Sequence, residues 1–426
     1  MMFIFMIVVF ILGYGFIALE HPLKINKSAT AILLAVALWF MLILMQGEPS
    51  NTNRELLGHL GSISEILFFL LGAMTIVELV DSHEGFRIIT DSIHTTKKVR
   101  LLWIISFITF FLSSVLDNLT TAIVMMALLR KLIADKKDRW FFGGMVIVAA
   151  NSGGAFSPIG DVTTIMLWIA GHVTSVNIIL KTFLPSLVSM VLPLGMLSLI
   201  MKGTVARPHQ AEKAGRSDPT PRYERNIVFF TGIGSLLFVP VFKTLTHLPP
   251  YVGILLGLGV LWTLTEIMHR SKNEEYKSRL TVAAVLRRVD TTTILFFLGI
   301  LLAVSALDSA GHLKMLADLL DKHIGNLYAV NTIIGLLSAV VDNVPLVAGA
   351  MGMYAGTFPP DHYFWEMLAY CAGTGGSILI IGSAAGVAVM GMEKMDFIWY
   401  LKKISPWALI GYFGGAVVYW ALSSLF

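Results

Sequence analysis

A short phrase occurs twice in this chain, and each copy places an ionisable acid in the middle of an apolar run. The first copy is LSSVLDNLTT, which contains Asp117 and Asn118. The second is LSAVVDNVPL, which contains Asp342 and Asn343. A carboxylate at membrane depth costs free energy, so it marks a functional site by default. Two copies in matching halves of one chain predict a central site built from both halves.

The composition is that of a membrane protein. Apolar residues make up 56% of the 426, charged residues only 14%, and the mean hydropathy is +0.77. Apolar runs of about 20 residues recur, which is the length that crosses a hydrocarbon core of roughly 30 Å. The single cysteine, Cys371, excludes an internal disulfide and a cysteine metal cluster. We expect an all-α polytopic membrane protein in contact with lipid, with no cofactor and no nucleic-acid partner.

The apolar runs and the basic residues together predict ten spans and two re-entrant hairpins. The spans are expected at 1–19, 28–46, 60–80, 140–171, 177–201, 226–246, 250–268, 291–310, 364–391 and 405–425. Residues 101–129 and 326–356 are expected to enter the membrane and return to the same side. With this assignment the cytoplasmic segments contain 26 of the 31 Lys and Arg residues, as the positive-inside rule prefers, and both termini lie outside.

Sequence matches divide the chain into two repeats. Matching residues follow in the same order at offsets of 227, 225 and 222: Phe69 and Gly72 with Phe296 and Gly299, Ser113 and Asp117 with Ser338 and Asp342, and Gly160 with Gly382. Residues 202–225 are rich in proline and charge, and they form the expected cytoplasmic linker between repeats 1–201 and 226–426. The first repeat starts outside and the second inside, so the repeat is inverted.

Each half also interrupts a span with glycines. NSGGAFSPIGDVTT runs from Asn151 to Thr164, and GTGGSILIIGSAAG runs from Gly373 to Gly386. Paired glycines, and Pro158 in the first motif, oppose a regular helix. Broken helices near the midplane free carbonyl oxygens at one half-helix and amide N–H groups at the next. With carboxylate, amide and hydroxyl groups nearby, they can form an oxygen cage for a hard cation.

The candidate ion-binding and proton-coupling residues carry the side-chain oxygens of these motifs. They are Asp117, Asn118, Thr120, Thr121, Asn151, Ser152, Ser157, Asp161, Thr163 and Thr164 in half one, and Ser338, Asp342, Asn343, Thr374, Ser377 and Ser383 in half two. Pro345 replaces Thr120 and Ser383 replaces Asp161 in the second copy, so we place the main ion site in half one. Two simpler explanations stay open: the aspartates only cap helices, and the glycines only pack helices. The histidines, including His83, are expected at the surface.

At these motifs the chain resembles the NhaD-type sodium/proton antiporters. They belong to an ion-transporter superfamily with arsenite permeases and divalent-anion/sodium symporters. The resemblance covers nearly the whole chain and is specific at Asp117–Thr121 and Asn151–Thr164. It implies elevator-like alternating access, often as a homodimer, and we expect a bacterial inner membrane. It also implies functional roles for Asp117, Asn118, Asn151, Asp161, Thr163, Thr164, Asp342 and Asn343. The anion symporters carry Ser-Asn-Thr at the hairpin tips, and aspartate in place of that serine opposes an anionic substrate.

These observations predict a secondary transporter rather than an enzyme. Na⁺ or Li⁺ is expected to compete with H⁺ at a site formed by Asp117, Asn118, Asn151 and Asp161. Exchange is obligatory if the site crosses the membrane only when it is filled. The alternatives are an arsenite or carboxylate permease, a passive channel and an intramembrane aspartyl protease. The last needs a G-x-G-D-like stretch, whereas Pro158-Ile159-Gly160 precedes Asp161 here.

Overall fold

The described part of the computed structural model is helical, with no β-strand among its residues. It comprises residues 2–18, 20–47, 49–90, 93–208, 220–270, 272, 277 and 279–424. Six of its helices are long and apolar enough to cross a membrane: α3 (Lys27–Gln46), α4 (Pro49–Ser82), α10 (Ser175–Ile200), α11 (Arg222–Thr246), α12 (Pro250–His269) and α15 (Thr291–Ser309). The predicted all-α class, and the coarse prediction of a polytopic membrane protein, agree with this.

The remaining apolar helices lie where the sequence predicted spans or hairpins. They are α1 (Met2–Ala18), α6 (Lys98–Ser113), α7 (Asn118–Leu132), α8 (Lys136–Ala155), α9 (Val162–Ile169), α17 (Leu327–Leu337), α18 (Asn343–Met353), α19 (Tyr363–Gly375), α20 (Ala384–Glu393) and α22 (Ser405–Ser423). The repeated Asp-Asn phrase joins α6 to α7 and α17 to α18. Each phrase therefore lies at the turn between two consecutive helices.

Five further helices, of 4 to 12 residues, connect these helices. They are α2 (Glu20–Leu23), α5 (Arg87–Thr90), α14 (Val282–Leu286), α16 (His312–His323) and α21 (Phe397–Lys403). The sequence predicts no span in the α16 segment, because its charged residues interrupt the apolar run. The span predicted at 60–80 lies within α4, which begins earlier, at Pro49, with polar turns.

Both predicted breaks are present. The first lies between α8 and α9, and the second lies between α19 and α20. Glycine is needed beside each break, since a Cβ at Gly153 would overlap the carbonyl oxygen of Phe110, and a Cβ at Gly375 would overlap that of Gly335. The glycines therefore let α8 approach α6, and α19 approach α17. Close helix packing, one of the simpler explanations, is a real part of their role.

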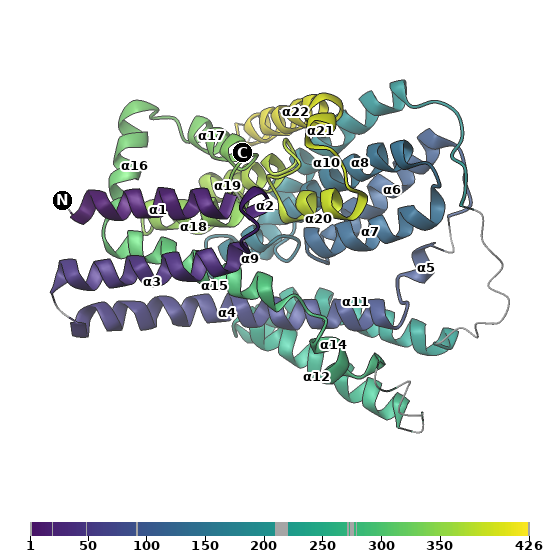
Figure 1. The fold of residues 1–426 in the computed structure, drawn as a ribbon, viewed down its shortest axis with the longest axis horizontal. Coiled ribbons are helices and arrows are strands. Elements are labelled where there is room, and N and C mark those ends of the chain that lie inside the picture. The colour runs from purple at the N-terminus through teal and green to yellow at the C-terminus, as the bar shows by residue number, and fades with distance from the viewer. Residues whose placement is uncertain are drawn as a thin grey trace.

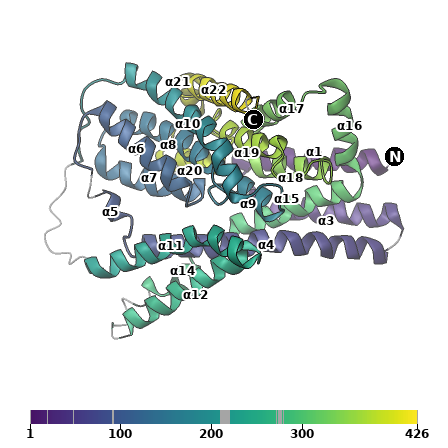
Figure 2. The same ribbon diagram turned by 180° about the vertical axis from the view of Figure 1, so that it is seen from behind.

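Figures 1 and 2 show two layers of helices. α4, α11 and α12 lie in one layer, and α6, α7, α8, α10 and α22 lie in the other. The packing partners recur in pairs: α4 packs on α12 and α15 on α3, α6 on α8 and α17 on α19, and α7 on α20 and α18 on α9. Apart from α3 and α12, for which no sequence match was found, each pair exchanges a helix of the first half for the helix that contains or follows the matching phrase in the second.

The structure describes only part of the predicted linker. The N–H of Val205 donates to the carbonyl of Thr96 at 2.8 Å, and residues 209–219 lie outside the described residues.

The prediction for the histidines needs correction. The surface prediction is wrong for His83, which is fully buried and stacks on His269 with ring centroids 5.1 Å apart. Burial lowers the pKa of the His83 imidazole.

Candidate ion-binding site

Four helices begin with candidate polar residues. Asp117 caps α7, Asp161 caps α9, Asp342 caps α18 and Ser383 caps α20. An N-cap side chain accepts hydrogen bonds from the first backbone N–H groups of its helix. Capping is therefore a real role of all four. Capping does not use the full acceptor capacity of the aspartates, because an ionised carboxylate has about four acceptor positions.

Asp161 lies at the centre of the polar cluster. Its Oδ1 accepts hydrogen bonds from the backbone N–H and the hydroxyl of Thr163, at 2.8 and 2.7 Å. The Nδ2 of Asn118 donates to Asp161 Oδ2 at 2.5 Å and to Asn151 Oδ1 at 3.0 Å. Asp161 is 1% exposed and Asn151 is 0% exposed. The cluster thus surrounds a buried carboxylate with donors that suit its ionised form.

The second half contributes to the same cluster. The Nδ2 of Asn343 lies 3.3 and 3.4 Å from the two carboxylate oxygens of Asp161. The Nδ2 of Asn151 donates to the hydroxyls of Ser377 and Ser383, at 3.0 and 2.9 Å. The structure therefore brings residues of both halves together around Asp161.

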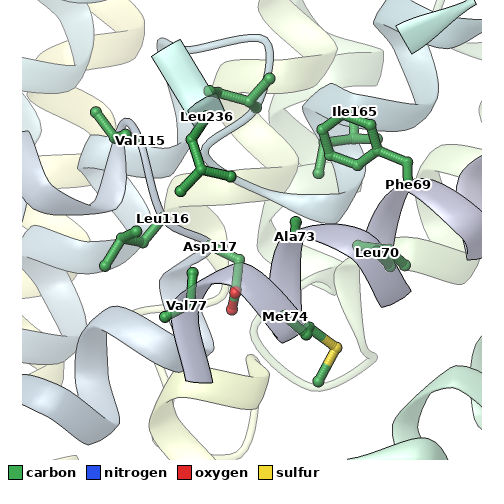
Figure 3. Close-up of a pocket in the computed structure, with 11 residues that line it drawn as sticks. Phe69, Leu70, Ala73, Met74, Val77, Val115, Leu116, Asp117, Ile165 and Leu236 are labelled. Atoms are coloured by element: carbon green, nitrogen blue, oxygen red, sulfur yellow. The ribbon is translucent and has the colours of Figure 1, made fainter. Parts of the chain in front are cut away.

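Asp117 lies at the edge of this cluster and faces an apolar cavity. Its carboxylate accepts from the backbone N–H of Thr120 at 2.8 Å and from the Thr120 hydroxyl at 2.5 Å. The cavity measures about 10 Å³, enough for about one water molecule. Its lining comes from the hairpin tip, α4, α9 and their neighbours, and Figure 3 shows Asp117 among these apolar side chains. A small cation or a proton would neutralise this carboxylate where little water reaches it.

Two more hydroxyls near Asp117 and Asp161 have different roles. Thr121 is fully buried, and its hydroxyl has no hydrogen-bond partner among the described residues, so it remains available as a ligand. The Thr164 hydroxyl instead completes a capping box, in which the N–H of Asp161 donates to Thr164 Oγ1 at 3.3 Å.

Four predicted site residues point to other partners. Their hydroxyls bond to backbone carbonyls or to a neighbouring helix: Ser152 to Ser189 at 2.7 Å, Ser157 to the carbonyl of Ser114 at 2.5 Å, Ser338 to that of Ala372 at 2.8 Å, and Thr374 to that of Tyr370 at 2.6 Å. The first three bonds join separate segments around the cluster, and the bond of Thr374 lies within α19. In this structure the four hydroxyls stabilise the fold of the site and do not join Asp161.

Sequence reasoning missed the surroundings of Asp342. The Lys27 ammonium lies 3.7 Å from Asp342 Oδ2, and the N–H of Asp342 donates to the hydroxyl of Tyr14 at 3.1 Å. Lys27 was counted only as a cytoplasmic charge in the topology. A lysine directly at the start of an apolar run is the one signal that could have identified it.

The comparisons with known proteins agree on a transporter. The family model described as "Citrate transporter" matches residues 5–369. "Sodium/proton antiporter 1" and "Sodium/proton antiporter 2" of Arabidopsis thaliana are 51% and 49% identical, over 99% and 98% of this chain and 72% and 99% of their own lengths. "Na(+)/H(+) antiporter NhaD" of Vibrio cholerae is 30% identical, over 98% of this chain and 91% of its own length. This chain is therefore similar to multi-pass membrane transporters from plants and bacteria.

Proposed function

We propose that this chain, which belongs to the family of NhaD-type sodium/proton antiporters, exchanges Na⁺ for H⁺ across a membrane. It is a multi-pass membrane transporter. The observation that carries the proposal is the buried carboxylate of Asp161, which is contacted by Asn118 from one half and by Asn343 from the other. The main cation site comprises Asp117, Asn118, Asn151 and Asp161, with Li⁺ as a second substrate.

Competition for the carboxylates explains why the exchange is coupled. Na⁺ and H⁺ each neutralise the same negative charge, so the presence of one disfavours the other. A protonated Asp161 would also accept fewer hydrogen bonds than an ionised one. Proton loading would thus weaken the contacts from Asn118 and Asn343 and loosen the oxygen cage, whereas cation loading would retain it.

The chemistry of the helix ends argues against an anionic substrate such as citrate. Helix N-termini favour negative charge, and α7, α9, α18 and α20 all begin at candidate residues. Three of their four caps are Asp117, Asp161 and Asp342, so that preference is already satisfied by the protein's own carboxylates. The "Citrate transporter" model therefore supports a transporter without supporting an anionic cargo.

The inverted repeat is part of this proposal. Two repeats, 1–201 and 226–426, each with one re-entrant hairpin, are supported by the recurring helix pairs and by matched bonds. The hydroxyl of Ser113 donates to the carbonyl of Ala150 at 2.7 Å, just as that of Ser338 donates to Ala372 at 2.8 Å. Elevator-like movement and a homodimer rest on the family resemblance alone. A bacterial inner membrane is not favoured over other membranes, since relatives come from plants as well as bacteria.

Reconstitution into proteoliposomes tests the function. We expect an imposed Na⁺ or Li⁺ gradient to drive proton movement, which a pH-sensitive dye detects. Equal gradients of K⁺ or choline should drive no proton movement. Citrate and arsenite should not accumulate under the same gradients. Citrate uptake in place of proton movement would contradict the proposal. Na⁺ flux without proton movement would instead indicate a passive channel.

A further inference from the structure

We propose that Lys27 is a built-in cation that occupies the position beside Asp342 where a transported cation would otherwise bind. The second repeat then binds no exchanged cation, and the stoichiometry is set by the first repeat alone. This inference rests on the proposed exchange of Na⁺ for H⁺ and deepens it. It begins from the ion pair between Lys27 and Asp342, whose charged atoms are 3.7 Å apart.

The two sequence-matched aspartates have different partners. Asp117 accepts a hydrogen bond from the hydroxyl of Thr120 at 2.5 Å. Pro345 stands at the matching position of the second repeat and offers no hydroxyl. Asp342 accepts instead from the N–H of Val344 at 3.2 Å and pairs with the Lys27 ammonium. A fixed positive charge has thus replaced a neutral donor.

A matched pair of phenylalanines places the lysine in the corresponding part of the repeat. Phe69 lines the cavity that Asp117 faces in the first repeat. Its sequence match in the second repeat is Phe296, and the Lys27 ammonium lies 4.3 Å from the centre of that ring. A ring face attracts a cation. In the second repeat, therefore, an ammonium lies close to both the matched ring and the matched aspartate, whereas in the first repeat Phe69 and Asp117 both line a cavity.

The lysine is also held in position by the helix that carries it. Lys27 begins α3, whose N-cap Asn26 accepts from the N–H of Ser28 at 2.9 Å, and its own N–H donates to Glu20 Oε1 at 3.2 Å. α3 packs against α15 in the way that α12 packs against α4. α12 begins with Pro250, which has no charge to offer Asp117. The unequal starts of these two helices account for the difference between the repeats.

Bound Na⁺ counted on the purified protein tests this role. The amount of radiolabelled Na⁺ bound per chain at saturation is measured for wild type, Lys27→Arg and Lys27→Met. We expect Lys27→Arg to match wild type, and Lys27→Met to bind a second Na⁺, because the Asp342 carboxylate loses its counter-charge. The double variant Lys27→Met with Asp342→Asn should return to the wild-type amount. An unchanged amount in folded Lys27→Met overturns the proposal.

A chemical rescue keeps the test decisive if Lys27→Met does not fold. Lys27→Cys is labelled either with aminoethyl methanethiosulfonate, which restores an ammonium, or with the neutral methyl reagent; the native Cys371 is buried. The neutral adduct should bind the additional Na⁺ and the ammonium adduct should not. Equal binding by the two adducts contradicts the proposal. A wild-type protein that binds no Na⁺ at all would overturn the proposed function instead.

Discussion

The two interrupted spans share one construction and differ in their chemistry. α9 and α20 each follow a glycine-rich break, and each begins with a side chain that caps the helix. That side chain is the carboxylate of Asp161 in the first half and the hydroxyl of Ser383 in the second, and Asn151 donates to Ser383 at 2.9 Å. The two breaks thus share one arrangement of helices, whereas only the first has a negatively charged cap. The same arrangement can therefore occur twice in a chain with different chemistry at each copy.

The largest difference is expected between the two caps themselves. Asp161→Asn should lower Na⁺-driven proton movement about 100-fold or more, because the amide carries no charge for a cation or a proton to neutralise. Its NH₂ group would also face the donors of Asn118 and Asn343. Ser383→Ala should lower the rate no more than about tenfold, since it removes one cap, worth about 1 kcal/mol. Initial exchange rates in proteoliposomes are measured for both variants. Equal losses of rate would show that the charge of Asp161 does not make the first break functionally different from the second.

The hairpin aspartates give the next comparison. Asp117→Asn should reduce exchange about 100-fold, because this carboxylate faces the cavity and belongs to the main cation site. Asp342→Asn should reduce it about tenfold or less, since Asp342 is already paired with Lys27. The same vesicle assay, with expression and folding checked by gel filtration, measures the two rates. Retained exchange in Asp117→Asn would remove Asp117 from the mechanism.

A single hydroxyl separates the two hairpin tips. Thr120→Val removes a short bond to the Asp117 carboxylate, worth about 1.5–3 kcal/mol for a charged acceptor. We expect the Na⁺ concentration for half-maximal exchange to change about tenfold. Pro345→Thr, the matching change in the second repeat, should alter it less than about twofold, because the Lys27 ammonium already faces Asp342. Similar shifts in both variants would mean that the two tips contact the cation equally.

The sequence could predict the features that depend on local chain properties. Apolar length predicted the long helices, and glycine with proline predicted the breaks beside Asp161 and Ser383. The repeated phrase predicted one central site built from both halves, but not the particular contact of Asn343 with Asp161. The sequence also showed that the negative charge belongs to Asp161 and that its match, Ser383, is neutral.

Side-chain directions could not be predicted, because they depend on how each helix is rotated against its neighbours. The hydroxyls of Ser152 and Thr374 belong to glycine-rich motifs, yet they bond to Ser189 and to the carbonyl of Tyr370. The pair of Lys27 and Asp342 joins residues far apart in the chain, and nothing local to either one indicates the other. Such contacts arise only when α3, α15 and the second hairpin are packed together.

The smallest effect is expected where the halves are alike. The hydroxyls of Ser113 and Ser338 make matched buried bonds to the carbonyls of Ala150 and Ala372. Ser113→Ala and Ser338→Ala should each cost about 1 kcal/mol of stability, because a buried carbonyl loses a donor, and should leave most of the exchange activity. Ser114→Ala, which removes an exposed bond to the carbonyl of Phe111, is the control and should cost less. Thermal unfolding in detergent compares the three. Clearly unequal shifts in unfolding temperature for Ser113→Ala and Ser338→Ala would mean that the two halves share a backbone arrangement but not equivalent side-chain bonds.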